Sequence, residues 1–327
     1  MRQRGFSGWT CSSEGPGHHR GKVISRRAIA SPGEELAAVS TEGPGGSPRP
    51  WFLPYLRNVH SQCGEDGVLE RIFETLGSTT RWAVELGAAD GVWFSNTRNL
   101  IAHQAWSAVL IECDAASYSR LRANYRDRPD VHCVRRLVTT QGSAEDTIEA
   151  ILRRTPIPAA FDLLSIDVDG NDYHVWNSLA AYRPRVVVIE FNPTIPSAVT
   201  FVQVDDANLN QGASLRALVE LGGRKGYRLV AATSWNAIFV IEEDWERLGI
   251  KDDSLESLRP DNSAVTHIFF GYDGTVLLDG AKHLPWHEAA VRQSDVQVLP
   301  AFLRHYPPRY SSWRRALFRL WRHWTAR

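Results

Sequence analysis

An acidic residue followed by two spaced glycines is the part of the sequence best suited to bind a ligand. Glu85 stands two residues before Gly87, and Gly91 follows four residues later. Glycine has no side chain, so such a loop lets a ligand approach the backbone closely. In α/β proteins a loop of this kind follows the first strand and binds a nucleotide cofactor. The stretch therefore predicts a cofactor site, although a Gly-x-x-x-Gly pair alone also fits an ordinary turn.

A second acid, Glu112, closes the next apolar run, Ala-Val-Leu-Ile-Glu. At the end of a second strand, a carboxylate can accept hydrogen bonds from both hydroxyls of a ribose. A carboxylate at this place could equally cap the helix that follows. Together with the glycine loop, Glu112 predicts that the cofactor contains a nucleoside.

Further oxygen-bearing side chains end two later strand-like runs. Asp167 and Asp169 lie in Ser-Ile-Asp-Val-Asp-Gly, and Glu190 and Asn192 end the next run. Residues two apart on a strand point to the same side, and hard oxygen ligands of this kind suit Mg²⁺. Either aspartate could instead act as a general base, for which His174 is a second candidate. A polar turn with an Asx cap is the alternative for the aspartates.

The segments around these residues alternate between strand-like and helix-like patterns. Near-continuous Val, Ile and Leu runs separated by helix-length segments are typical of an α/β fold with a mainly parallel sheet and helices on both faces. The last two runs are joined only by residues 233–236, too few for a crossover helix, so these strands should pair antiparallel. Strands are expected at 83–86, 108–111, 131–138, 161–168, 186–191, 227–232 and 237–241. Helices are expected at 99–105, 117–126, 144–154 and 214–222, after a first helix that starts within residues 61–66 and continues to Leu76.

The glycine loop differs from the fingerprints of other nucleotide sites. A dinucleotide site has Gly-x-Gly-x-x-Gly, whereas Ala89 stands here in place of the second glycine. The Lys-Ser/Thr of a P-loop is absent as well. An acid directly before the loop suits a cofactor that carries no diphosphate. These features and the antiparallel last strand favour S-adenosylmethionine.

Three motifs resemble those of the FkbM-type S-adenosylmethionine-dependent methyltransferases. They are residues 84–91 (Val-Glu-Leu-Gly-Ala-Ala-Asp-Gly), 110–112 (Leu-Ile-Glu) and 165–170 (Ser-Ile-Asp-Val-Asp-Gly). The likeness covers roughly residues 60–245, and Asp169 stands where the family usually has Glu. The resemblance implies a Rossmann-like class I methyltransferase fold. It also implies O-methylation of a hydroxyl on a small-molecule acceptor, such as a sugar, a polyketide or another secondary metabolite.

The resemblance also implies roles for individual residues. Those that would line the methionine end of the cofactor are Glu85, Gly87, Ala88 and Gly91. Glu112 would hold the ribose, and Ser61 and Gln62, just before the first helix, could reach the methionine carboxylate. Two other classes of protein stay open. One is a non-catalytic binding module that keeps the fold, and the other, less favoured, is a nicotinamide-dependent oxidoreductase.

The overall composition limits which classes of partner and which location are expected for the protein. Lys+Arg and Asp+Glu balance at 37 each in the 327 residues, so we expect no nucleic-acid partner. No apolar stretch reaches the ~18 to 20 residues that cross a bilayer. The first residues also lack the apolar core of a signal peptide. We therefore expect a cytoplasmic protein.

The two ends of the chain differ from its middle. Residues 1–50 are rich in Gly, Pro, Ser and charge and are expected to be disordered, and residues 55–295 are expected to form the methyltransferase domain. The tail at 296–327 holds seven arginines and no acid. Its apolar residues recur on one face of a helix: Trp313, Leu317, Leu320, Trp321 and Trp324. We expect this basic aromatic helical tail to pack on its own sheet or a second subunit, or to lie on an anionic membrane surface.

Overall fold

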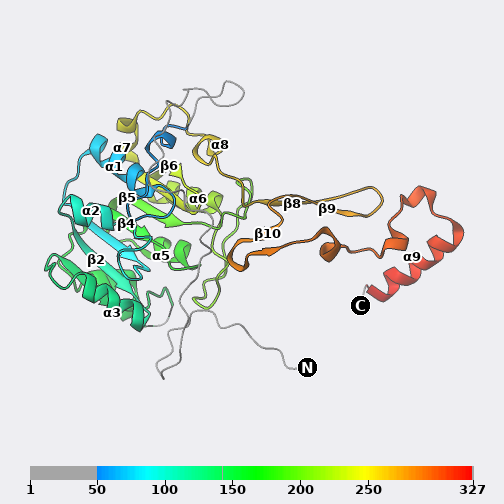
Figure 1. Ribbon diagram of the computed structural model, residues 1–327, viewed down its shortest axis with the longest axis horizontal. Coiled ribbons are helices and arrows are strands. Elements are labelled where there is room, and N and C mark those ends of the chain that lie inside the picture. Colours follow the sequence, from blue (N-terminus) through cyan, green and yellow to red (C-terminus); the bar gives the residue numbers. More distant parts are fainter. Residues whose placement is uncertain (1–49, 142, 326–327) are drawn as a thin grey trace. The chain divides into compact units, whose positions relative to one another are not determined.

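The computed structural model describes residues 50–141 and 143–325 (Figure 1). The arm expected at residues 1–50, apart from Pro50, lies outside the described residues, as do the last two residues of the tail. The chain divides into two compact units. One comprises the described residues up to Asn192 together with Ser197–Pro260, and the other comprises Pro193–Pro196 together with the described residues from Asp261 onwards. Residues 261–295 thus fall in the second unit, whereas the expected domain boundary was residue 295.

The first unit is built on a seven-stranded sheet. Its strands are β1 (Trp82–Leu86), β2 (Ser107–Glu112), β3 (Val131–Arg135), β4 (Ala160–Ile166), β5 (Arg183–Glu190), β6 (Tyr227–Ala232) and β7 (Asn236–Ile241). They lie in the order β3-β2-β1-β4-β5-β7-β6. Strands β1 to β5 are parallel, and β7 runs antiparallel to both of its neighbours. This is the Rossmann-like sheet of the class I methyltransferases, as the sequence predicted.

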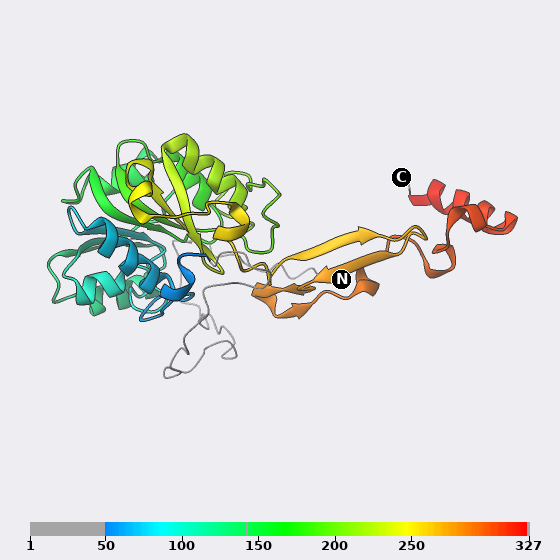
Figure 2. The same ribbon diagram turned by 90° about the horizontal axis from the view of Figure 1, so that it is seen from above.

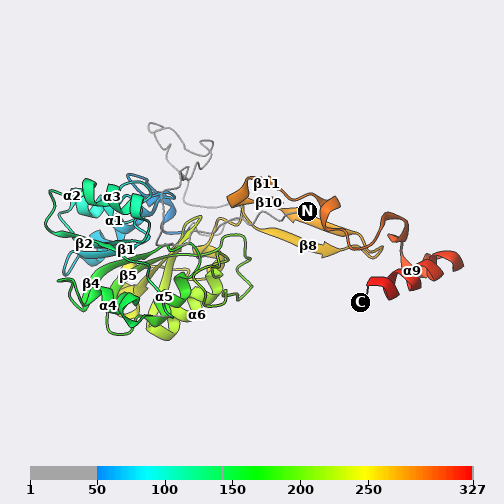
Figure 3. The same ribbon diagram turned by 90° about the horizontal axis from the view of Figure 1, so that it is seen from below.

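Helices cover both faces of this sheet. They are α1 (Glu65–Leu76), α2 (Arg98–His103), α3 (Ala115–Asn124), α4 (Ile148–Leu152), α5 (Asp172–Ser178) and α6 (Leu215–Lys225), with the short α7 (Glu242–Trp245) and α8 (Leu255–Leu258) beyond them. Figure 3 shows α1 to α3 on one face and α4 to α6 on the other, and Figure 2 shows the same division from another side. The parallel strands are therefore covered on both faces, which explains their continuous apolar runs.

The core lies between the sheet and these two helix layers. Val186, Val187, Val188 and Ile189 are fully buried, although successive side chains of a strand point to opposite faces. Helix α1 buries one apolar stripe and ends at Gly77, whose φ of 69° is left-handed. Burial on both sheet faces leaves the strand ends as the place for polar side chains.

Two of the helices that cover the sheet, α4 and α5, differ from the expected ones. Helix α5 was not predicted, because only two of its seven residues, Val175 and Trp176, are buried and apolar. The helix expected at 144–154 is divided instead into a 3-10 turn and α4. The side chain of Thr147 accepts a hydrogen bond from the Ala150 N–H (3.3 Å) and so begins a new helix there.

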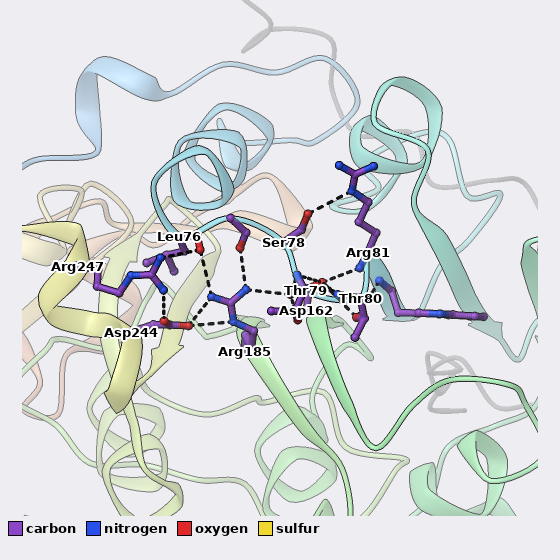
Figure 4. A network of polar contacts seen from close by, with 11 residues as sticks. Leu76, Ser78, Thr79, Thr80, Arg81, Asp162, Arg185, Asp244 and Arg247 are labelled. Atoms are coloured by element: carbon purple, nitrogen blue, oxygen red, sulfur yellow. Dashed lines mark hydrogen bonds and ion pairs between the residues drawn. The ribbon is translucent and has the colours of Figure 1, made fainter.

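A buried polar network joins several elements at the amino end of the sheet (Figure 4). The fully buried carboxylate of Asp162 in β4 accepts hydrogen bonds from the backbone N–H groups of residues 79–81 (2.7 to 3.0 Å). Arg185 of β5 lies with Nη1 3.1 Å from Asp162 and with Nη2 2.7 Å from Asp244. Arg247 also pairs with Asp244 (2.7 Å). The network thus holds β4, β5 and α7 together at the edge opposite the glycine loop.

The second unit contains small antiparallel sheets and one longer helix. Its elements are β8 (Thr266–Phe270), β9 (Val276–Gly280), β10 (His283–Leu284), β11 (Ala289–Ala290) and α9 (Ser312–Thr325). Val276 and Leu278 of β9 are buried, but Ile268 and Phe270, which face them across the pair, are largely exposed. Within the described residues, no helix has the length and apolar character needed to span a bilayer.

Candidate cofactor and catalytic site

The glycine loop lies where the strand order reverses, between β1 and β4. Gly87 has a left-handed φ of 72°, and a Cβ at this position would lie 1.8 Å from the carbonyl oxygen of Asp167. The Asp167 N–H donates to the Leu86 carbonyl (3.3 Å). Gly87 therefore allows the loop after β1 to touch the loop after β4. Ligands of open α/β sheets bind in the crevice at such a reversal.

Glu85 is buried and turned toward the segment that follows the loop. Its carboxylate accepts hydrogen bonds from the Ser95 hydroxyl (2.7 Å), the Asn96 N–H (2.8 Å) and the Thr97 hydroxyl (2.6 Å). Burial raises the pKa of Glu85, an effect that these three hydrogen bonds oppose. The Asn96 amide in turn donates to the Ser165 hydroxyl of β4 (3.1 Å). Glu85 thus organises the path from the glycine loop to α2, and sequence reasoning missed these three partners.

Gly91 meets a packing requirement at the other end of the loop. Its φ is 71°, and a Cβ would lie 2.5 Å from Leu121 Cδ1 and 2.6 Å from Tyr125 Cε2. The Tyr125 hydroxyl donates to the Gly91 carbonyl (2.7 Å), and burial raises the pKa of Tyr125 to about 12. Gly91 is therefore needed where the loop packs on the end of α3.

Glu112 links the end of β2 to the glycine loop. Its Oε2 accepts from the Ala89 N–H (2.8 Å) and its Oε1 from the Asp114 N–H (2.7 Å). The Ala88 N–H donates to the carbonyl of Ile111, next to Glu112 (3.1 Å). Burial raises the pKa of Glu112. Asp114, not Glu112, caps α3 by accepting from the Ser117 N–H (2.8 Å), so the capping alternative for Glu112 does not describe this structure.

The loop after β4 is held by a buried carboxylate that the sequence did not single out. Asp172 accepts from the Val168 N–H and the Gly170 N–H, both at 2.9 Å. Burial raises the pKa of Asp172 to about 6. Asp169 takes a left-handed φ of 58° between these two donors. The loop therefore presents Asp167 and Asp169 in one fixed conformation.

Three carboxylates meet at this edge of the sheet. One oxygen each from Asp167, Asp169 and Glu190 lies within 4.8 Å of the others, and the two aspartates are exposed while Glu190 is half-buried. Like charges this close repel one another, and a bound divalent cation relieves the repulsion. The structure thus brings together three of the four residues predicted to bind Mg²⁺. Asn192, the fourth, uses its amide Nδ2 to donate to the Gln211 carbonyl (2.9 Å).

His174 is engaged with a neighbouring segment. Its Nε2 lies 2.8 Å from the backbone carbonyl of Gln203. A carbonyl oxygen can only accept, so Nε2 carries the proton and Nδ1 is the nitrogen able to act as a base. The Gln203 side chain accepts from the Gln211 N–H (2.8 Å) and the Gly212 N–H (2.9 Å). His174 and Gln203 together anchor the 201–213 segment beside the Asp167–Gly170 loop.

Ser61 and Gln62 lie at the start of α1. The Ser61 hydroxyl accepts from the Asp66 N–H (3.0 Å), and Asp66 Oδ2 accepts from the Ser61 N–H (2.7 Å). The Gln62 side chain is exposed. The adjacent Glu65 is fully buried, and its Oε1 accepts from the Thr233 hydroxyl (2.6 Å) in the link between β6 and β7. The start of α1 is therefore fixed against the sheet.

A separate cavity of about 550 Å³ opens at the other end of the sheet. Its walls include Tyr182, Arg183, Lys225 and Tyr227, from the first residues of β5 and β6 and the end of α6. Lys225 donates there to the Leu179 carbonyl (2.6 Å). None of the predicted site residues lines this cavity.

Comparison with known proteins supplies no family assignment. No family model and no curated protein matches the sequence. Among solved structures, the N-terminal domain of EvdMO1 with SAH bound is similar at 13% identity over 54% of this chain and 79% of that one, with a TM-score of 0.36. The METTL16 MTase domain is similar at 13% identity over 53% and 65%, with a TM-score of 0.35. A putative caffeoyl-CoA O-methyltransferase from Staphylococcus aureus is similar at 13% identity over 53% and 81%, also with a TM-score of 0.35.

These values are low, and the fold assignment rests on the strand order and the antiparallel β7. The strand order and the antiparallel β7 thus define the fold as the Rossmann-like class I methyltransferase fold.

Proposed function

We propose that this chain is an S-adenosylmethionine-dependent methyltransferase that methylates a hydroxyl oxygen of a small-molecule acceptor. One observation carries the proposal. At the reversal of a class I sheet, the acid that ends β2, Glu112, is hydrogen-bonded to the glycine loop after β1 through Ala89. The Asp167 loop touches the same glycine loop at Gly87. The residues proposed to hold the nucleoside and a set of carboxylates thus lie next to each other at the same end of the sheet.

The residues around the glycine loop fit S-adenosylmethionine. Both carboxylate oxygens of Glu112 accept backbone N–H groups, and the carboxylate keeps further lone-pair capacity for a ribose hydroxyl. Gly87 brings backbone, without a side chain, to the place where the methionine end would lie. When bound, S-adenosylmethionine supplies a methyl group attached to a positively charged sulfonium sulfur. The carbon of this methyl group is the atom that a nucleophile attacks.

The chain must then align the acceptor and remove its proton. The hydroxyl oxygen attacks the methyl carbon in line, the carbon–sulfur bond breaks, and the hydroxyl proton passes to a base. Asp167 and Asp169 are the first candidates for this base because their loop touches the glycine loop. His174 is the second candidate through Nδ1, because its Nε2 donates to Gln203.

The three clustered carboxylates support a metal site beside the glycine loop. Asp167, Asp169 and Glu190 offer only oxygen ligands, which suit Mg²⁺. A cation held there would lower the pKa of an acceptor hydroxyl that it contacts. In this version of the proposal, the aspartates position the acceptor and a separate group takes the proton.

The acceptor would lie against the 201–213 segment. This segment lies against the Asp167–Gly170 loop. A Cβ at Gly170 would lie 2.6 Å from the Leu209 carbonyl oxygen, and the Asn210 side-chain amide donates to the Asp169 carbonyl (2.5 Å). We propose an FkbM-type enzyme on the basis of the Asp167-x-Asp169-Gly170 turn, with a sugar or another secondary metabolite as the acceptor.

Methyl transfer itself is the test. The full-length protein is incubated with methyl-labelled S-adenosylmethionine and a panel of hydroxylated sugars and aromatic metabolites, and products are identified by mass spectrometry. Titration calorimetry compares S-adenosylmethionine with NAD(H). We expect binding of the methyl donor and a labelled ether product. Binding without transfer to any acceptor would favour a non-catalytic module, and binding of NAD(H) alone would contradict the proposal.

A further inference from the structure

Helix α9 carries an apolar face that the other described residues of its own unit do not cover. Trp313, Leu317, Leu320 and Trp324 follow one another at spacings of four, three and four residues, so they share one side of the helix. They are 56%, 37%, 61% and 83% exposed, respectively. An isolated helix of this length is marginal in water, so a face of this kind is typical of a helix that binds a further surface.

The opposite side of α9 is the one that packs within its own unit. The Phe318 ring lies edge-on to Tyr310, with ring centres 5.9 Å apart. Arg315 Nε donates to the Tyr310 carbonyl (3.1 Å), and Arg314 Nε donates to the Phe302 carbonyl (3.1 Å). The helix is therefore anchored through Phe318, which leaves the Trp313–Trp324 face outward.

The charge of α9 has a single sign. Arg314, Arg315, Arg319 and Arg322 lie on the helix, and no Asp or Glu occurs anywhere after Asp295. Within the described part of the chain, none of these four arginines forms an ion pair. The charge complement of the helix is therefore an anionic surface.

We propose that α9 lies in the plane of an anionic membrane surface, with its Trp and Leu side chains in the acyl boundary and its arginines among the headgroups. A lipid surface would contact both sides of the helix, because Trp side chains favour the membrane–water interface and arginine side chains reach the headgroups. A nucleic acid or an acidic protein surface would engage the arginines but leave the four apolar side chains in water. A second copy of α9 would place like charges together.

Vesicle co-sedimentation of the full-length protein tests this proposal. Vesicles of phosphatidylcholine alone are compared with vesicles that also contain phosphatidylserine, at low and at high salt. We expect binding to the anionic vesicles at least about tenfold tighter than to the neutral ones, and weaker binding at high salt because counterions screen the arginines. Absence of vesicle binding by the full-length protein would overturn the proposal.

Paired variants separate the two sides of the helix. Trp313→Ser with Trp324→Ser should reduce binding to all vesicles by about tenfold or more, since two large apolar side chains are lost. Arg319→Ala with Arg322→Ala should remove most of the preference for anionic vesicles, a loss of roughly tenfold to thirtyfold. Tyr272→Ser is the matched control, because Tyr272 is a 90% exposed aromatic residue outside α9. Circular dichroism checks that each variant is folded.

Two further measurements address the rival partners. Light scattering without vesicles would show a concentration-dependent dimer if a second copy covers the Trp face, and loss of that dimer in the double-Trp variant would overturn the membrane assignment. Binding of a single-stranded oligonucleotide with an affinity equal to that for anionic vesicles would also overturn it.

Discussion

The α-carbon of Gly87 lies so close to the carbonyl oxygen of Asp167 that a Cβ on Gly87 would lie 1.8 Å from that oxygen. No heavy atom can occupy that place, so the contact between the cofactor loop and the carboxylate loop requires glycine. The same contact makes the geometry of the two loops interdependent. A change in one loop should therefore affect the ligands of the other.

Replacing Gly87 with alanine should destabilise the protein and weaken binding of S-adenosylmethionine together. The left-handed backbone costs a Cβ-bearing residue about 1 kcal/mol, and displacing the Asp167 carbonyl should raise the total above about 3 kcal/mol. Gly249→Ala is the matched control, because Gly249 has a left-handed φ of 63° but nothing within 4 Å of its Cβ position. Urea unfolding and calorimetry measure the two effects. Equal destabilisation by the two variants would show that the contact with Asp167 is unimportant.

Much of the sheet could be predicted because its evidence is local. The continuous apolar runs of β1, β2 and β4 show burial on both faces, and the four-residue link at 233–236 requires an antiparallel pair. The ends of these runs also place the acids correctly, so Asp167, Asp169 and Glu190 were expected together and do cluster.

The partners of the buried acids could not be predicted in the same way. Glu65 accepts a hydrogen bond from Thr233, which is 168 residues away in the sequence. No local sequence pattern indicates such a pair. Glu85 is predicted to line the methionine end of the cofactor, and in the structure its carboxylate also accepts hydrogen bonds from the Ser95 and Thr97 hydroxyls. The only signal for that contact was the small polar run Ser95-Asn96-Thr97 soon after the acid, where a buried carboxylate finds its donors.

Glu112→Gln should weaken binding of the methyl donor by about tenfold or more. A glutamine side chain has one acceptor oxygen, so its NH₂ group must face either the Ala89 N–H or the Asp114 N–H. The loop would then be displaced and the ribose acceptor lost. Asp114→Asn is the control, since asparagine caps a helix as well as aspartate does. Unchanged affinity in the Gln variant, measured by calorimetry, would rule out the ribose role.

Removing the cation should reduce activity if the carboxylate cluster binds Mg²⁺. Treatment with EDTA should abolish most of the methyl transfer, and added Mg²⁺ should restore it. The reason is that the cation neutralises the three clustered carboxylates, which favours the metal-bound form of the protein. Asp169→Asn should weaken Mg²⁺ binding in calorimetry without ligand. The exposed Asp127, paired only with Arg126, provides the control Asp127→Asn. Full activity after EDTA treatment would exclude a metal-dependent mechanism and leave an aspartate or His174 as the base.

The Asp162 network should make stability fall in acid. Burial acts to raise the pKa of Asp162, but the N–H groups of residues 79–81 outweigh it and lower the pKa from its ordinary value of 3.8. A lowered folded-state pKa contributes stability that is present above about pH 4 and is lost as the pH falls through the folded-state value. Asp162→Asn should therefore cost about 3 kcal/mol or more at pH 7, because Arg185 loses a buried partner, and this cost should shrink as the pH falls through the lowered folded-state pKa of Asp162. The exposed pair Arg183–Glu243 supplies the control Glu243→Gln, expected to change the free energy of unfolding by less than about 1 kcal/mol. Urea unfolding of the three proteins across this pH range measures the difference, and a cost for Asp162→Asn that does not change with pH would show that the Asp162 charge is not what stabilises the network.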